Sequence, residues 1–164
     1  MQLTYAINQS AAQAGQLYDL SEYDFVSAVN PSADVPFGVA LAQGAADGQC
    51  KLPAASGDIA KILGVAALVQ TKEQPLPSAS GPVVYKMGSD IALMRKGRIY
   101  VKVEEAVSAM DAVFIRFASG GGGTQLGAFR KSADTASAAQ VSGAVYRTSA
   151  GANGFAVVEF NLPA

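Results

Sequence analysis

The feature that most constrains the fold is a strict alternation of apolar and polar side chains. In residues 98–104 every second position is isoleucine or valine, and the positions between them are aromatic or charged. Successive side chains of a β-strand point to opposite faces, so this period of two predicts a strand with one buried face. Residues 112–117 repeat the pattern, with Val113 and Ile115 on the apolar face and Arg116 on the other.

Short β-prone runs separated by turn residues continue over residues 36–162, a spacing typical of an all-β sandwich or small barrel. Ser56 and Asp58 precede an apolar stretch and predict one short helical turn that Gly64 would end. The glycine run at 120–123 predicts a mobile loop between strands. Further strands, which bring the total to about eight, are expected at residues 35–41, 64–69, 90–94, 128–131, 140–147 and 155–162.

Residues 1–34 differ from the rest of the chain because they show no clear period. We therefore divide the chain into an extended N-terminal arm, residues 1–34, and a β-rich domain, residues 35–164. Tyr18, Tyr23 and Phe25 lie in the arm, and aromatic residues are enriched as interface anchors. Two interpretations stay open: these residues anchor the arm on a neighbouring subunit, or they complete the core of their own domain.

Composition narrows the classes of function. The chain has 164 residues, enough for one domain, and half of them are hydrophobic. The formal net charge is −1, from 12 basic and 13 acidic residues, so no electrostatic footprint for nucleic acid is visible. No apolar run approaches the roughly 20 residues that a membrane-spanning helix needs. We expect neither nucleic-acid binding nor a membrane segment, and synthesis in the cytoplasm.

The sequence offers little for catalysis. It has no histidine and a single cysteine, Cys50, which excludes a histidine-based triad and the common zinc sites. Paired carboxylates can hydrolyse glycosidic bonds, but those of this chain are expected on a strand face or beside a turn, where aspartate bonds its own backbone. We therefore expect no enzyme activity, no metal and no cofactor. The carboxylates concerned are Asp90, Glu104, Glu105 and Asp111.

The order and spacing of several short motifs resemble a family of bacteriophage capsid decoration proteins, also called structural cement proteins. The longest motif covers residues 95–101 and is followed by motifs at residues 103–107 and 111–117. Shorter motifs lie at residues 36–38, 47–48, 51–53, 64–66, 127–130 and 155–161. Met110, Ala112 and the glycine run depart from the family pattern, and all of them are expected in turns.

The resemblance implies a β-rich domain on the outer surface of an icosahedral phage head, made in the cytoplasm of the host bacterium. Its implied role is to bridge neighbouring major capsid subunits, so the expected partners are the major capsid protein and further copies of this chain. The high apolar fraction and low charge favour a homotrimer, with a homodimer as the alternative. The resemblance implies no catalytic residues.

The basic side chains are concentrated in and after the longest motif. If the two alternating strands pair, Lys102 and Arg116 share a face, which is either solvated or directed at acidic capsid surface. The candidate interface residues are Tyr18, Tyr23, Phe25, Arg95, Arg98, Lys102 and Arg116.

The main alternative function is a glycan-binding or adhesin-like β-sandwich on a virion or cell surface. Tyr5, Tyr18 and Tyr23 would supply its aromatic platform, and titration with sugars separates it from a cement protein. A small hydrolase is a weaker alternative, because a serine or aspartate nucleophile would lack a supporting histidine.

Overall fold

The computed structural model describes residues 12–69, 84–121 and 123–162, and nearly all of their regular structure is β. The one helix among these residues, α1 (Ser56–Ile59), is a single turn. The strands are β1 (Asp24–Val29), β2 (Val35–Pro36), β3 (Ala40–Gln43), β4 (Cys50–Lys51), β5 (Ile62–Ala66), β6 (Val84–Tyr85), β7 (Asp90–Lys102), β8 (Ala112–Arg116), β9 (Phe129–Arg130), β10 (Ala138–Tyr146) and β11 (Phe155–Asn161).

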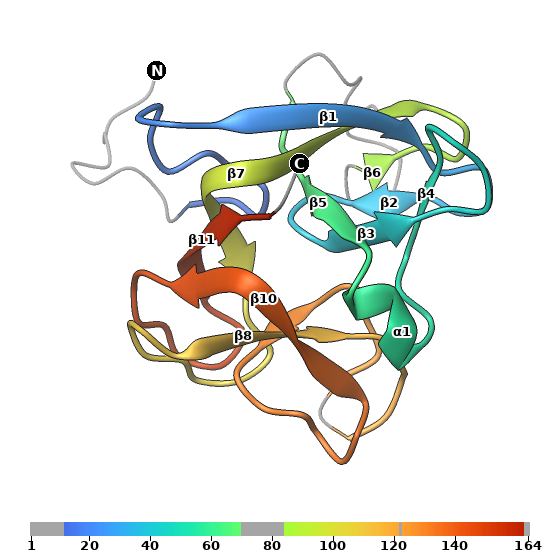
Figure 1. The fold of residues 1–164 in the computed structure, drawn as a ribbon. Coiled ribbons are helices and arrows are strands. Elements are labelled where there is room, and N and C mark those ends of the chain that lie inside the picture. The colour runs from blue at the N-terminus through green and yellow to red at the C-terminus, as the bar shows by residue number, and fades with distance from the viewer. Residues whose placement is uncertain (1–11, 70–83, 122, 163–164) are drawn as a thin grey trace, which may run out of the picture.

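Most strands belong to one nine-stranded antiparallel sheet, with the order β4-β3-β5-β7-β11-β10-β8-β9 and β1 also paired to β7. Strands β2 and β6 form a separate pair. The sheet curls into a half-barrel, with β1, β3 and β5 in the upper half of Figure 1 and β8 and β10 in the lower half. The all-β, barrel-like fold class predicted from the sequence is confirmed.

Strand β7 organises the sheet. Met94 pairs with Phe25 of β1 and with Val65 of β5, so β1 and β5 lie on opposite edges of β7. Lys96 pairs likewise with Asp24 of β1 and with Asn161 of β11. Strands β5 and β11 therefore share one edge of β7.

The N-terminal segment, residues 15–29, occupies the other edge of β7. Ahead of β1, the Gly15 N–H donates to the Tyr100 carbonyl at 2.8 Å, and the Tyr18 N–H donates to the Arg98 carbonyl at 3.0 Å. The segment thus runs antiparallel along β7 from Tyr100 to Asp90. The sequence placed no strand in residues 1–34, so β1 was missed; residues 1–11 lie outside the described part of the chain.

A bulge bends β7 in its middle. Asp24 pairs with Lys96 but Phe25 pairs with Met94, so Arg95 is the extra residue. Gly97 has φ 123°, a backbone region that L side chains rarely adopt, and a Cβ there would lie 3.0 Å from the Glu22 carbonyl oxygen. The sequence predicted two runs, 90–94 and 98–104, and the structure joins them into one 13-residue strand.

Two apolar clusters fill the half-barrel. The larger includes Ile99, Val101, Val113 and Ile115, which confirms the buried face predicted for both alternating runs. The smaller lies under β1, β2, β3 and β5 and includes Tyr85, whose hydroxyl donates to the Ala67 carbonyl at 2.7 Å. Burying each such side chain stabilises the fold by about 1.5–3 kcal/mol.

Other predicted elements are found with shifted bounds. The predicted strand 35–41 divides into β2 and β3, because the chain turns at Gly38, where φ is 72°. The predicted helical turn is present as α1, but it ends at Ile59, and Gly64, predicted to end it, lies inside β5. The Asp58 carboxylate accepts hydrogen bonds from the N–H groups of Ala54 and Ala55 at 2.9 and 3.1 Å, so it caps the turn.

Candidate functional site

The structure brings most of the predicted interface residues together along the middle of β7. Tyr18 lies beside Arg98, as its backbone hydrogen bond shows, and Arg95 forms an ion pair with Asp24 of β1. A Cβ on Gly97 would lie 3.2 Å from the Tyr23 Cβ, which places Tyr23 over the bulge. Lys102 and Arg116 lie elsewhere.

The N-terminal segment carries an exposed group of large apolar side chains, which we call the apolar patch: Tyr18, Leu20 and Tyr23. Their exposed fractions are 47%, 72% and 51%. Phe25 differs, because it is half-buried, packs against the larger core cluster and meets the Tyr23 ring edge to face, with centroids 5.7 Å apart. Phe25 therefore contributes to the core of its own domain, whereas the patch presents apolar surface to the outside.

Ion pairs border the apolar patch. Glu159 of β11 lies between two arginines, with Arg147 Nη2 at 2.8 Å and Arg98 Nε at 2.7 Å from its oxygens. These two guanidinium groups, Arg147 foremost, lower the pKa of Glu159 to about 2. Arg98 also reaches Asp19 at 3.1 Å. Arg98 is therefore fixed within its own chain by two carboxylates.

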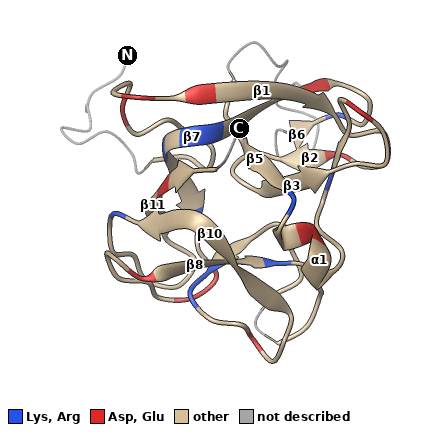
Figure 2. Ribbon diagram, in the orientation of Figure 1, with Lys and Arg blue, Asp and Glu red and all other residues tan. Residues whose placement is uncertain are grey.

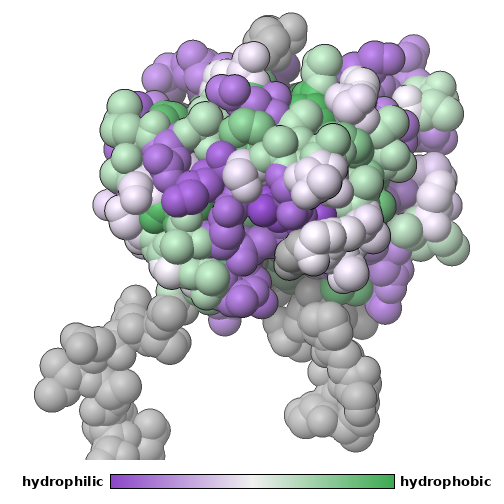
Figure 3. All heavy atoms as spheres, turned by 90° about the horizontal axis from the view of Figure 1, so that it is seen from below, coloured by the Kyte–Doolittle hydropathy of each residue, from purple (hydrophilic) through white to green (hydrophobic). Residues whose placement is uncertain are grey.

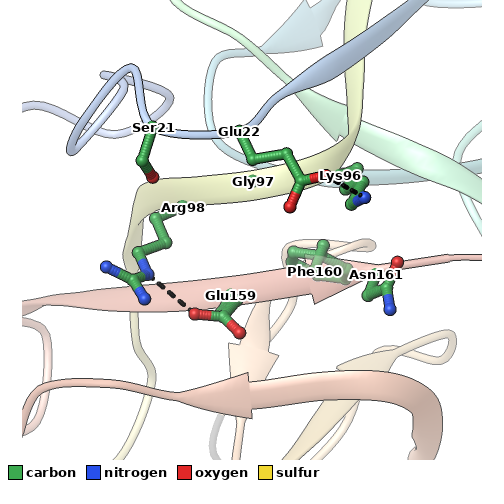
Figure 4. Close-up of a pocket in the computed structure, with 8 residues that line it drawn as sticks. All are labelled: Ser21, Glu22, Lys96, Gly97, Arg98, Glu159, Phe160 and Asn161. Atoms are coloured by element: carbon green, nitrogen blue, oxygen red, sulfur yellow. Dashed lines mark hydrogen bonds and ion pairs between the residues drawn. The ribbon is translucent and has the colours of Figure 1, made fainter.

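A pocket of about 220 Å³ opens beside this network (Figure 4). It is lined by Ser21, Glu22, Lys96, Gly97, Arg98, Glu159, Phe160 and Asn161. Lys96 pairs with Glu22 at 2.6 Å and Arg98 pairs with Glu159, as the dashed lines show. The charged groups that line the pocket are thus already partnered, which leaves none of them to hold an ionic ligand.

The charges of the whole fold are mixed in sign. Figure 2 shows lysine, arginine, aspartate and glutamate interspersed along the strands and loops. Figure 3 shows the face below β8 and α1, where hydrophilic residues gather in the middle and weakly hydrophobic residues lie on either side. The ribbon in Figure 2 carries both signs in its upper and its lower half.

Lys102 lies at the C-terminal end of β7, exposed, and forms no ion pair with any residue that the structure describes. It borders a groove of about 480 Å³ whose lining includes Phe37, Val39 and Val103. Glu104 and Gly123 also line the groove. Lys102 is thus exposed, which fits both a solvated side chain and one directed at a partner.

Arg116 does not share a face with Lys102, because β7 and β8 are not neighbours in the sheet and the Arg116 side chain is fully buried. Its Nε donates to both Glu104 oxygens at 2.8 and 2.9 Å, and its Nη1 donates to the carbonyls of Ala118 and Gly120, each at 3.0 Å. Nη2 binds Asp134. Glu104 and then Asp134 raise the pKa of Arg116, so the guanidinium stays charged. Arg116 therefore has no surface to offer a partner, and its role is inside the fold.

A second buried arginine, Arg130, completes this cluster, which we call the arginine cluster. Its Nη1 lies 3.0 Å from Glu104 and 2.9 Å from Asp134, and its Nε donates to the Ser132 carbonyl at 2.9 Å. Glu105 joins through Arg130 Nε at 3.3 Å. Charged arginines in this number are stable in the interior only because carboxylates and carbonyls surround them.

Two unusual backbone segments hold the arginine cluster. Asp134, Thr135 and Ala136 have φ values of 44°, 53° and 66°, a left-handed turn that costs roughly 1–2 kcal/mol per residue and brings Asp134 onto both arginines. Gly120 and Gly123 exchange backbone hydrogen bonds at 3.1 Å, and a Cβ on Gly123 would lie 2.1 Å from a Glu104 oxygen. The glycine run therefore closes over the cluster. Its spacing gave no sign of this, because the contacts are distant in sequence.

Three of the four carboxylates considered for catalysis, Glu104, Glu105 and Asp111, have structural partners, whereas Asp90 is exposed at the start of β7. Glu104 belongs to the arginine cluster, and Glu105 accepts hydrogen bonds from the Lys131 and Ser132 N–H groups at 3.0 Å. Burial opposes ionisation of Glu105, but the bonds from Ser132 and Lys131 and the charge of Arg130 outweigh it and lower its pKa. Asp111 accepts from the Ser108 N–H at 2.9 Å.

Two further properties concern only the described ranges. Within them, no group of three or more cysteine, aspartate and glutamate residues is arranged to hold a metal ion. No helix there is both long and apolar enough to cross a membrane. Cys50 is buried, and burial raises the pKa of its thiol to about 11.

Comparison with known proteins adds the family. Residues 1–161 match the family model described as structural cement protein (E217 gp24/Pam3 gp6). A solved structure entitled "The capsid of Myoviridae Phage XM1" contains a chain with the same fold, with a TM-score of 0.73 and 19% identity over 98% of this chain and 97% of that one. No curated protein matches. Because the family match spans nearly the whole sequence, the chain belongs to the phage structural cement protein family.

Proposed function

We propose that this protein binds the outer surface of a phage head, bridges neighbouring major capsid subunits and so stabilises the shell. The observation that carries the proposal is the family match over residues 1–161. A subunit that binds only the assembled shell shifts the equilibrium toward it, and many weak contacts suffice when the copies are numerous. The proposal includes a location on the virion surface after synthesis in the bacterial cytoplasm, and no direct contact with nucleic acid.

The apolar patch is the proposed contact with the capsid. Exposed tyrosine and leucine side chains bury large apolar area with little rotamer entropy lost, and aromatic residues often dominate binding energies. The neighbouring arginines are held by Asp24, Asp19 and Glu159, so they orient the surface and set its register. Lys102, free of ion pairs among the described residues, is a second candidate for an acidic capsid group.

Co-sedimentation with undecorated heads tests this role. We expect the Leu20→Ser/Tyr23→Ser variant to bind at least about tenfold more weakly, since hot-spot truncations cost 2 kcal/mol or more each. Met87→Ser is the matched control, because Met87 is 60% exposed but lies outside the patch. Wild-type protein that fails to bind heads contradicts the function; a patch variant that binds normally contradicts only the patch.

Self-association belongs to the proposal, as a homotrimer or a homodimer. The glycan-binding alternative gains no support from the arrangement of the tyrosines. Tyr18 packs edge to face on Tyr100 at 66° and Tyr23 packs on Phe25 at 67°, so the two rings rest on different neighbours and do not stack on each other as one platform. A sugar titration that gives no signal is the expected result.

A further inference from the structure

Among the residues that the structure describes, none forms a strand along one edge of β1 over most of its length. On that side the Val29 N–H donates to the Gly48 carbonyl at 3.0 Å, so the backbone of Val29 faces away from β7. Backbone groups alternate between the two edges of a strand, and therefore Phe25 and Ser27 face the same way. No backbone hydrogen bond joins Phe25 or Ser27 to a described residue on that side.

This edge lacks the usual protection against pairing. Edge strands are commonly shortened, bulged or interrupted by lysine or proline. Strand β1 has six residues with neither lysine nor proline, and its one charged residue, Asp24, is paired with Arg95. The bulge falls between Asp24 and Phe25, so residues 25–29 are regular. Figure 1 shows β1 at the upper margin of the fold.

We propose that this edge pairs with β1 of a second copy of this chain, antiparallel about a two-fold axis at Val26. The proposal rests on the self-association included in the proposed function and names its surface. With the axis at Val26, Phe25 lies opposite Ser27 of the partner subunit, and Ser27 lies opposite Phe25 of the partner subunit. Each of these opposed pairs exchanges two backbone hydrogen bonds.

The chemistry of β1 favours its own copy as the occupant. Its two outward-facing residues without a described partner, Phe25 and Ser27, are two positions apart. The backbone donors and acceptors of both residues therefore find partners in a second copy when the axis passes through the residue between them, Val26. The axis sets Asp24 opposite Ala28 of the partner subunit, which avoids like charges facing each other. Pairing uses up the free edge, so the assembly closes as a dimer.

A cysteine cross-link tests the position of the axis. Val26 would face its own copy as a pair without hydrogen bonds, with Cα atoms about 4.5 Å apart, which lies in the range of about 4.4–6.8 Å that a disulfide spans. We expect Val26→Cys to give a covalent dimer on mild oxidation. Ser27→Cys is the matched control and stays monomeric on a denaturing gel, because the two residues 27 would be diagonal neighbours about 7–8 Å apart. Buried Cys50 gives no background.

A second measurement uses mass in solution. Proline at position 27 removes the backbone N–H that faces away from β7 and leaves every hydrogen bond to β7 in place. Ser27→Pro should therefore halve the mass measured by light scattering and leave the circular dichroism spectrum unchanged. Ser27→Ala keeps the donor and should keep the dimer mass. If Ser27→Pro does not fold, Ser27→Lys places a charge on the edge and should have the same effect on mass.

Several results would overturn the proposal. These are an unchanged mass in the folded edge variant, a cross-link in Ser27→Cys but not in Val26→Cys, or a wild-type protein that is monomeric in solution. A wild-type monomer that still binds heads removes this inference and leaves the proposed function. A cross-linked dimer that does not bind heads removes the proposed function and leaves the interface.

Discussion

Arg116 shows how a single residue can reverse a prediction made from alternation. The period of two correctly assigned Arg116 to the face opposite Val113 and Ile115. It could not show that this face is covered, because the cover comes from Gly120, Gly123 and the turn at Asp134. The residue type also gave little indication of burial, since arginine is rarely buried unless it is paired.

Removing this charge should be costly. We predict that Arg116→Met lowers the free energy of unfolding by about 3–5 kcal/mol, because Glu104 and Asp134 then keep only Arg130. Lys102→Met is the control and should change it by less than about 0.5 kcal/mol, since Lys102 is exposed. Urea denaturation measures both. Equal midpoints for the two variants would show that the arginine cluster contributes nothing to stability.

Glu159 should make stability depend on acid. Its pKa falls from 4.5 to about 2 on folding, so the unfolded chain binds more protons between these values and stability rises with pH there. The contribution is complete above about pH 4.5 and lost as pH falls through about 2. We predict that Glu159→Gln has a lower melting temperature than wild type at neutral pH. The difference in melting temperature should shrink as the pH falls from about 4.5 to about 2. A difference that stays constant with pH would contradict the assignment.

At the scale of elements, the strands of the alternating runs were predictable, and so were the turns between them. The continuity of β7 was not, because Arg95, Lys96 and Gly97 interrupt its alternation at the bulge. Strand β1 was not predicted from the sequence, for a different reason. Four of its first five residues are partly buried or buried, so both of its faces pack and no period appears.

The N-terminal segment should therefore behave as part of the sheet. We predict that a chain starting at Ala12 folds, whereas a chain starting at Val35 does not, because the latter exposes the edge of β7 that residues 15–29 cover. Circular dichroism and thermal melting compare the two truncations. A stable fold for the shorter chain would mean that residues 12–34 are an arm after all.

The contact between the glycine run and the arginine cluster can be tested with a second glycine as the control. A Cβ on Gly123 would lie 2.1 Å from a Glu104 oxygen, whereas a Cβ on Gly151 meets nothing within 4 Å. We predict that Gly123→Ala destabilises the protein by about 1–3 kcal/mol, and that Gly151→Ala is neutral or stabilising by up to about 1 kcal/mol. Thermal melts of both variants measure the contrast. Equal melting temperatures would mean that the loop yields without disturbing the arginine cluster.

At the scale of the whole molecule, the charges are satisfied largely within the chain and the net charge is −1. Raising the salt concentration from about 0.1 to 1 M shortens the Debye length from about 10 to 3 Å and so weakens contacts between exposed charges. Because we expect the contact to be mainly apolar, we predict that the affinity for heads changes less than about tenfold over this range. Sedimentation with heads at both concentrations measures the affinity. A steep loss of binding would indicate that exposed cations, Lys102 foremost, carry the contact.

The first and last strands of the described chain both pair with β7, and this has a mechanical consequence. The N-terminal segment and β11 both run antiparallel to β7 on its two edges, so they are parallel to each other. A pull that separates residue 12 from residue 162 drags these strands lengthwise past β7 in opposite directions. Their hydrogen bonds, which lie across the strands, are then loaded in shear and together, instead of being unzipped singly. The arrangement therefore resists stretching along β7, the kind of load that the proposed bridging of subunits in a shell under internal pressure would impose.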